Sequence, residues 1–481
     1  MSCSLEEVPK GSVGPGDFYK TEAQCTAGLN ACYPPLKSMY NNSYFFITEA
    51  TDDLFRQQST SNINATMQIS PSSPGHGTNM WSYGYQGVRN CLSVIDGTSR
   101  ATGISASKRA ALLAEGKIML ALYWYHLTCF FGDVPYYDRN ITTTEELLRV
   151  AALPRTSADE IRNECILILR ECVEDLPQVR SCEVENNRSG AALGWMLIAK
   201  MAMWNKSWDT ALEALDRLEE IYGNLSQYPL EDLMWRYKNT PERIFEIQHT
   251  REVGGLSYTS TVASYVMPYP KTAGTAIYNG VEIPELGADA TCYTPIRANS
   301  RFYSQIMGAE NVDKRWHLNL CMTYEGHSFN GTTPYRYPGF KFWCPGLYGT
   351  QDSNNYPVFR YADALLMKAE CLLENGDTDG CIRYLNMVRD RAGVTPYTSG
   401  SYADLIQYVR DERARELAGE FQRKYDLVRW GIWYEETVKY NIFSTLLRNI
   451  KPCHEYYPIP DSEVKASGGN LDNAAYTANG L

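Results

Sequence analysis

The chain has 481 residues, of which 44% are hydrophobic and 21% charged, a composition typical of a globular protein with a substantial buried core. Its formal net charge of −11 argues against the basic surface that nucleic-acid binding requires, and favours an uncharged or weakly charged ligand. No apolar run reaches the roughly 18 residues of a membrane-spanning helix. The length suits two or three ordinary domains, or one large helical scaffold with a long insertion.

Tyrosine and tryptophan dominate the aromatic residues, with 35 Tyr and 10 Trp against 14 Phe. Their rings combine an apolar face with a hydrogen-bonding edge, which suits a hydrated binding surface. The alternative for any single tyrosine is that it caps a helical core and directs its hydroxyl to the surface. Composition leaves both readings open.

The N-terminus carries Cys3 directly after Met1 and Ser2, and a short polar segment, SLEEVPKGSVGPGD, follows it. Taken alone, Cys3 can be an ordinary cysteine at an unstructured end. The charged and then apolar pattern of a secretory signal peptide is not present, so we expect any such peptide to be missing from this sequence.

The 14 cysteines include no CxxC pair and no Cys/His spacing of the zinc type. Cys165 and Cys172 lie seven residues apart on one face of a predicted helix, where core packing is favoured over a disulfide bond. Cys25 and Cys32 share this spacing. The count of cysteines leaves their pairing and their redox compartment open.

Helical periodicity runs through residues 17–250, which we assign to an N-terminal helical region. An amphipathic helix is predicted by apolar residues at helical spacing, namely Leu113, Leu120, Trp124, Leu127 and Phe131. Gly132 and Pro135 end this helix. Ser157 and Glu160 predict a capping box at the start of the next helix. A helix pair over 191–205 and 208–221 follows, joined by a very short turn.

Between residues 251 and 355 the helical pattern is lost, and Gly, Pro, Thr, Asn and Tyr dominate. We predict a loop-rich insertion with short strands. Because a structureless loop of this length inside a compact domain is improbable without a function, we expect the insertion to bind the ligand. A shorter polar loop, Asn62 to Asn79, interrupts the N-terminal helices just before Trp81, and it is the second region in which we expect a site.

The last region, residues 356–481, returns to helices. Small and apolar residues form one stripe at Ala362, Leu366, Ala369 and Leu373, and a second stripe ends before Gly393. This helix, short turn and helix unit is similar to a tetratricopeptide-type hairpin, and comparable pairs recur without a strict period. The sequence therefore predicts a mostly α fold, an α-solenoid of stacked hairpins that carries a large loop-rich insertion.

A strongly charged run, Asp411 to Arg429, is predicted to have a structural role and not to bind a ligand. Asp411 and Arg415 stand at i and i+4, where they can pair on a helix surface. The remaining charged side chains are predicted to form a partly buried ion-pair lattice, namely Arg413, Glu416, Arg423, Asp426 and Arg429.

Catalytic signatures are missing. HEYYP at His454 lacks the second histidine of a zinc-protease helix, and the sequence has no GxSxG, GxGxxG or GxxxxGK[ST] motif. Asp377 and Asp379 begin like a calcium loop, but Ile382 and Val388 occupy its glycine and glutamate positions. A carboxylate pair for glycoside hydrolysis stays open among 56 acidic residues, and nothing singles one out.

Glycan recognition needs aromatic faces for sugar C–H groups and a rim of amides, carboxylates or guanidinium groups for the hydroxyls. The insertion offers both kinds of side chain. We take as candidate ligand contacts Tyr265, Tyr278, Tyr293, Tyr324, Trp343, Tyr348, Asn279 and Arg297.

Several blocks together resemble signatures of the SusD/RagB family, in the order and spacing of that family. They are WSYGYQGVRNCLSVI from Trp81, AEGKIMLALYWYHLTCFFGDVP from Ala114, FRYADALLMKAE from Phe359, DERARELAGEFQRKYDLVRWG from Asp411 and YYPIPDSEV from Tyr456. The family usually has Glu before Gly ahead of its aromatic-Arg segment, whereas here Gly419 precedes Glu420. This changed order puts the local packing at Gly419 in doubt, but it does not affect the expected fold.

The resemblance implies a SusD-like outer-membrane lipoprotein that is exposed on the cell surface, lipidated at Cys3 and tethered through residues 1–16. It implies capture of an oligosaccharide or polysaccharide and delivery to a SusC-like TonB-dependent transporter, with no chemistry on the glycan. We assign no cofactor and no metal ligand from the sequence, and whether calcium assists binding stays open. Three alternatives stay open: a SusD-like lid for peptide or other nutrient cargo, a helical-repeat interaction scaffold without a sugar site, and a glycosidase.

Overall fold

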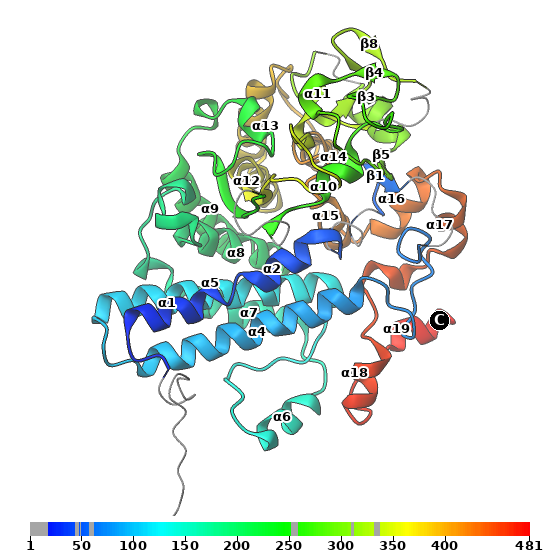
Figure 1. Ribbon diagram of the computed structural model, residues 1–481. Coiled ribbons are helices and arrows are strands. Elements are labelled where there is room, and N and C mark those ends of the chain that lie inside the picture. The colour runs from blue at the N-terminus through cyan, green and yellow to red at the C-terminus, as the bar shows by residue number, and fades with distance from the viewer. Residues whose placement is uncertain are drawn as a thin grey trace, which may run out of the picture.

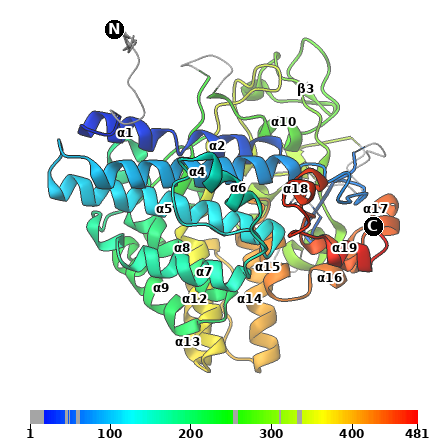
Figure 2. The same ribbon diagram turned by 90° about the horizontal axis from the view of Figure 1, so that it is seen from below.

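The computed structural model describes residues 18–43, 48, 50–56, 62–251, 258–308, 312–330 and 337–481. Cys3 and the predicted tether at residues 1–16 lie outside the described residues. Helices form most of the described structure, and the predicted mostly α fold is confirmed (Figures 1 and 2).

The N-terminal region consists of long helices that run side by side (Figure 2). Their bounds are α1 Glu22–Asn30, α2 Pro34–Ser38, α4 Gly77–Arg100 and α5 Ala106–Phe131. The amphipathic stripe predicted for α5 understates its burial, because the helix is buried all round from Ile118 to Phe131, with α4, α7 and α8 packed around it. As predicted, α5 ends at Gly132, whose φ of 66° suits glycine.

Helix hairpins continue the scaffold. Their helices are α7 Ala158–Arg170, α8 Ala191–Trp204, α9 Trp208–Tyr222, α12 Tyr361–Glu374, α13 Thr378–Ala392 and α14 Tyr402–Glu416. The α8–α9 and α12–α13 hairpins are confirmed, and α12 packs on α9, so that hairpins distant in sequence stack on one another. The capping box of α7 is present, since the Ser157 hydroxyl accepts from the Glu160 amide at 3.2 Å.

Shorter helices complete the described chain. Their bounds are α6 Thr144–Ala151, α10 Val262–Val266, α11 Trp316–Asn319, α15 Arg423–Arg429, α16 Trp433–Tyr440, α17 Ser444–Asn449, α18 Asp461–Ala466 and α19 Ala474–Ala478. In Figure 1, α6 and α18 lie below the layer of α4 and α5, on the side away from the insertion.

Two paired strands bracket the insertion. Strand β2, Arg243–Ile247, pairs antiparallel with β10, Tyr356–Arg360, with Ile247 opposite Tyr356. The chain therefore leaves the scaffold and returns to it at one place. Within the insertion the strands are short, namely β3 Ile277–Tyr278, β4 Val281–Glu282, β5 Ile296–Ala298, β6 Leu320–Cys321, β7 Thr323–Tyr324, β8 His327–Ser328 and β9 Tyr337–Pro338. Strand β1, Leu54–Arg56, pairs with β5 and ties the insertion to the N-terminal region.

The predicted ion-pair lattice is confirmed and is more deeply buried than expected. At its centre, a guanidinium nitrogen of Arg360 lies 2.6 Å from Glu416, and Arg360 also contacts Glu420 and Glu242. Burial alone would raise the pKa of Glu416, but Arg391 and Arg360 hold it well below its ordinary value. Further pairs join Arg413 to Asp426, Arg423 to Asp52, and Arg429 to Glu370.

The pair predicted between Asp411 and Arg415 was wrong. Arg415 turns into the interior, where it contacts Glu412 at 3.1 Å and donates to the carbonyl of Ile306. Asp411 stays near the surface and lies 3.4 Å from Arg301. An i,i+4 pair needs both side chains on the solvent side of a helix, and α14 is buried on the Arg415 side.

The local order Gly419-Glu420 has a clear packing reason. Gly419 has a φ of 68°, and a Cβ atom there would collide with the ring of Phe342. The turn directs Glu420 into the ion-pair lattice, where it contacts Arg360 and Lys341.

All 13 cysteines in the described part of the chain are free. Cys165 and Cys172 are buried, as predicted for core packing, and so are Cys25 and Cys32.

Candidate functional site

The insertion has a small apolar core of its own, and two predicted contacts belong to it. Tyr278 and Trp343 are 0% and 1% exposed, packed with Met267, Ile283 and Leu347. The Tyr278 hydroxyl donates to the carbonyl of Gly287 at 2.7 Å. Since protein covers both rings in this conformation, they hold the loops in place and do not offer a face to a sugar.

Asn279 and Arg297 are also interior. The Asn279 amide donates to the carbonyl of Asn330 at 2.6 Å and to the Tyr337 hydroxyl at 2.9 Å. The Arg297 guanidinium carbon lies 3.9 Å from the centre of the Tyr337 ring. These contacts join segments that are far apart in the insertion, so both side chains support its shape.

The half-buried Tyr265 and the exposed Tyr293 lie against each other, and we call them the tyrosine pair. Their ring centres lie 6.1 Å apart at an angle of 45°, and Tyr293 is 57% exposed. Tyr265 comes from α10, and the backbone amide of Tyr293 donates to the carbonyl of Ser264 at 2.8 Å. Backbone contacts therefore fix the two rings relative to each other.

A buried carboxylate supports α10 beneath the tyrosine pair. Asp352 accepts hydrogen bonds from the backbone amides of Ala263 at 3.1 Å and Asn354 at 2.9 Å. Burial raises the pKa of Asp352 to about 7. Thr261, at the start of α10, donates to Asn41 at 2.9 Å and links the site to the N-terminal helices.

Tyr348 adds a second exposed ring near the tyrosine pair. It is 59% exposed, and the Arg251 guanidinium carbon lies 5.5 Å from its ring centre. The carbonyl of its neighbour Gly349 accepts from the Thr291 amide, two residues before Tyr293. Adjacent backbone segments thus carry Tyr348 and Tyr293.

Tyr324 is half-buried on the strand β7, with its ring centre 6.0 Å from that of Trp343. It sits at the edge of the insertion core. Of the eight predicted contacts, the structure therefore places the half-buried Tyr265 and the exposed Tyr293 and Tyr348 on adjacent segments of the insertion. For these three, ligand contact stays a prediction.

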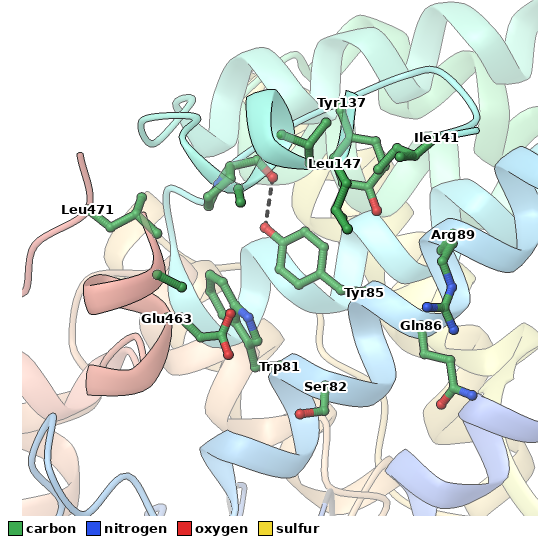
Figure 3. Close-up of a pocket in the computed structure, with 14 residues that line it drawn as sticks. Trp81, Ser82, Tyr85, Gln86, Arg89, Tyr137, Ile141, Leu147, Glu463 and Leu471 are labelled. Atoms are coloured by element: carbon green, nitrogen blue, oxygen red, sulfur yellow. Dashed lines mark hydrogen bonds between the residues drawn. The ribbon is translucent and has the colours of Figure 1, made fainter. Parts of the chain in front are cut away.

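A groove elsewhere on the molecule was not anticipated from the sequence. It is a groove of about 490 Å³ between α4, the segment 135–141, α6 and α18 (Figure 3). In the sequence, Trp81 begins one of the family-like blocks and Pro135 follows the end of a predicted helix, and neither marks a groove. The available signal was the adjacent pair Leu147 and Leu148, which are 55% and 66% exposed on a helix with no buried residue.

The described ranges contain neither a cluster of metal ligands nor a helix suited to cross a membrane. No three His, Cys, Asp or Glu side chains gather so that they could hold a metal ion. Among the same residues, no helix combines the length and the apolar character needed to cross a membrane.

Two family models match different parts of the chain. The family described as "Starch-binding associating with outer membrane" matches residues 7–193. The SusD family model matches residues 300–476. Neither match includes the part of the insertion that carries the tyrosine pair.

Known proteins are similar to the whole chain or to part of it. SusD-like protein P25 from Formosa agariphila is 26% identical over 100% of this chain and 97% of its own length. Starch-binding protein SusD from Bacteroides thetaiotaomicron is 30% identical over 27% of this chain and 23% of its own.

Solved structures share the fold. A laminarin-binding SusD-like protein superposes with a TM-score of 0.76 at 22% identity, over 94% of this chain and 99% of that one. Surface glycan-binding protein A from Bacteroides thetaiotaomicron, in complex with laminarihexaose, gives a TM-score of 0.74 at 21% identity, with the same coverage of both chains.

Proposed function

Because the chain belongs to the SusD/RagB family, we propose that it is a non-catalytic, cell-surface glycan-binding protein. It captures an oligosaccharide or polysaccharide and passes it to a SusC-like TonB-dependent transporter in the outer membrane. The relatives support glycan binding through their names, which include starch-binding and laminarin-binding proteins. One of the two matching family descriptions also supports association with the outer membrane.

The tyrosine pair is the observation that carries the binding proposal. The exposed ring of Tyr293, tilted against Tyr265 and near Tyr348, provides the apolar faces on which sugar C–H groups stack. An open aromatic surface of this kind gives micromolar to millimolar affinity for one site, and a polymer that meets several sites gains avidity. The net charge of −11 favours a neutral glycan over an acidic one.

Delivery to a transporter needs a lid and an anchor. In this proposal Cys3 carries the lipid, and residues 1–16 form the tether that lets the protein stay at the membrane surface. The helical hairpins pack on the transporter, and the exposed surface of the insertion presents the glycan to it. A peptide or other nutrient is the alternative cargo for the same arrangement.

Native affinity electrophoresis against soluble plant, microbial and host polysaccharides tests the binding proposal. We expect retardation by at least one polysaccharide, and weaker retardation in Tyr293→Ala and Tyr348→Ala. Tyr402→Ala is the matched control, since Tyr402 is 53% exposed but lies on α14. Unchanged mobility across a broad panel would contradict glycan capture and favour peptide cargo or a purely structural lid.

A further inference from the structure

The groove between α4, α6 and α18 has an aromatic and aliphatic floor. Tyr85 and Tyr137 lie nearly parallel, with ring centres 6.4 Å apart, and Trp81 lies beside Tyr85 (Figure 3). The Tyr85 hydroxyl is fixed by donation to the carbonyl of Pro135 at 2.7 Å. Aliphatic side chains complete the floor, from Ile141, Leu147 and Leu471. The floor is therefore apolar, and a hydrogen bond fixes its Tyr85 ring.

Polar side chains stand around this floor without partners of their own. Ser82, Gln86 and Arg89 follow one another along one side of α4, and Glu463 of α18 lies across Tyr85 from Arg89 (Figure 3). Within the described residues, none of these four side chains makes a hydrogen bond or an ion pair. Their hydrogen-bonding capacity is available to a ligand.

The aromatic floor and the polar side chains around it together favour a carbohydrate ligand. Stacking faces together with a hydroxyl, an amide, a guanidinium group and a carboxylate can bind the C–H faces and the hydroxyls of a sugar. Arg89 and Glu463 carry opposite charges, so the groove has no net charge and favours a neutral ligand over an anion. Its volume of about 490 Å³ lies in the range of small-ligand sites, about 300–1,000 Å³.

We propose that this groove is a second carbohydrate-binding site, which takes one or two neutral pyranose rings. It lies on the helical scaffold, on the side away from the insertion (Figure 1). The proposal rests on the proposed function, because it assumes that the cargo is a glycan. Two sites on one protein let a long polysaccharide bind with avidity, while each site alone binds a short fragment weakly.

Isothermal titration of the full chain tests the groove separately from the tyrosine pair. The probe is an oligosaccharide prepared by partial hydrolysis of whichever polysaccharide is retained in electrophoresis. We expect two molecules bound per chain, and one in Gln86→Ala/Arg89→Ala/Glu463→Gln. Retardation by the intact polysaccharide should weaken about tenfold or more as avidity is lost. Glu463→Gln alone, which preserves the shape of the side chain, guards against misfolding of the triple variant and should weaken the groove site measurably.

The matched control is Arg100→Ala, which removes another arginine of α4 whose side chain is 70% exposed and which lies outside the groove. It should bind two oligosaccharides, as the unaltered chain does. One bound oligosaccharide in the unaltered chain, lost entirely in Tyr293→Ala and untouched in the groove variants, would overturn the second site and leave the proposed function standing. A chain that retains none of the polysaccharides would overturn both. Binding that survives Tyr293→Ala and disappears in the groove variants would support the groove alone.

Discussion

Arg423 donates two hydrogen bonds to Asp52, from Nε to Oδ1 at 2.7 Å and from a terminal nitrogen to Oδ2 at 2.9 Å. Asp52 also accepts from Arg301 at 2.6 Å, and all three residues are buried. The Asp52 carboxylate, which lies just before β1, is thus joined to α15 and to the segment after β5. The insertion is held to the scaffold at this point as well as at the β2–β10 pair.

Asp52→Ala should therefore destabilise the protein strongly. The substitution leaves two buried guanidinium groups without their partner, which costs about 3–5 kcal/mol of unfolding free energy. Chemical denaturation followed by circular dichroism measures the loss. Asp411→Ala is the control, because Asp411 contacts Arg301 at 3.4 Å near the surface and should cost less than about 1 kcal/mol. Equal losses in the two variants would refute the central place of Asp52.

Much of this scaffold is predictable from local sequence. The stops at Gly132 and Gly393, the Ser157 capping box and the α12–α13 stripe follow from helix physics, which acts over a few residues. The partners in the ion-pair lattice are different, since Asp52 lies far in the sequence from Arg423. The sequence marked the charged run as structural and could not pair it across that distance.

The candidate site was less predictable, for a physical reason. Tyr278 and Tyr293 have the same side chain and similar loop surroundings in sequence, yet one is 0% exposed and the other 57%. Burial in the insertion depends on its small core around Trp343, which tertiary contacts create without a helical or strand period. The groove at Tyr85 was missed because three separated segments build it.

Gly419→Ala tests the turn that orders the ion-pair lattice. The added methyl group meets the Phe342 ring, and the φ of 68° disfavours a side chain. We expect a loss of about 2–4 kcal/mol in unfolding free energy. Gly431→Ala is the matched control, with a φ of 69° and no atom near the added group, and should cost only about 1 kcal/mol. The difference between the variants measures the Phe342 contact, and a difference near zero would contradict it.

Three buried histidines predict a loss of stability in mild acid. Burial lowers the pKa of His126 to about 3 and those of His249 and His454 to about 4. In the unfolded chain their pKa is about 6.5, so below pH 6.5 the unfolded state binds more protons. Stability contributed by these groups is present above pH 6.5 and is lost as the pH falls toward 4.

Denaturation of His126→Gln between pH 7 and 4 checks this. The Tyr40 hydroxyl lies 2.7 Å from His126 Nε2, and glutamine can keep a hydrogen bond there. Removal of one titrating group should make the stability curve flatter by up to about 1.4 kcal/mol per pH unit. A slope equal to that of the unaltered chain would mean that folding does not lower the pKa of His126.

Buried Lys424 should make the stability of the protein depend on pH above neutrality. Burial lowers the pKa of its amine to about 7, and Nζ donates to the carbonyl of His454 at 3.2 Å. Because its pKa in the unfolded chain is about 10.4, the unfolded state binds more protons between pH 7 and 10. Stability should rise with pH across this window.

Lys424→Met should remove that rise, and should stabilise the protein at pH 6 to 7 by about 1 kcal/mol or more, since methionine needs no proton and no hydration. Denaturation at pH 6, 7, 8 and 9 gives both results. A destabilised variant with an unchanged slope would show that the folded protein keeps Lys424 charged throughout.

Asn279 tests whether the buried members of the insertion control binding through its shape. Asn279→Gly keeps the left-handed backbone, φ 48°, and removes the hydrogen bonds to Asn330 and Tyr337. We expect about 1–3 kcal/mol of lost stability, faster proteolysis within the insertion and weaker glycan retardation, although the tyrosine pair is unaltered.

Glu325→Gly is the control, because it makes the same change at an exposed residue with φ 47° and should leave stability and retardation unchanged. If Asn279→Gly loosens the insertion and glycan retardation stays the same, the glycan site does not depend on the fold of this loop. If retardation falls with stability, the buried contacts set the position of the rings that the ligand meets.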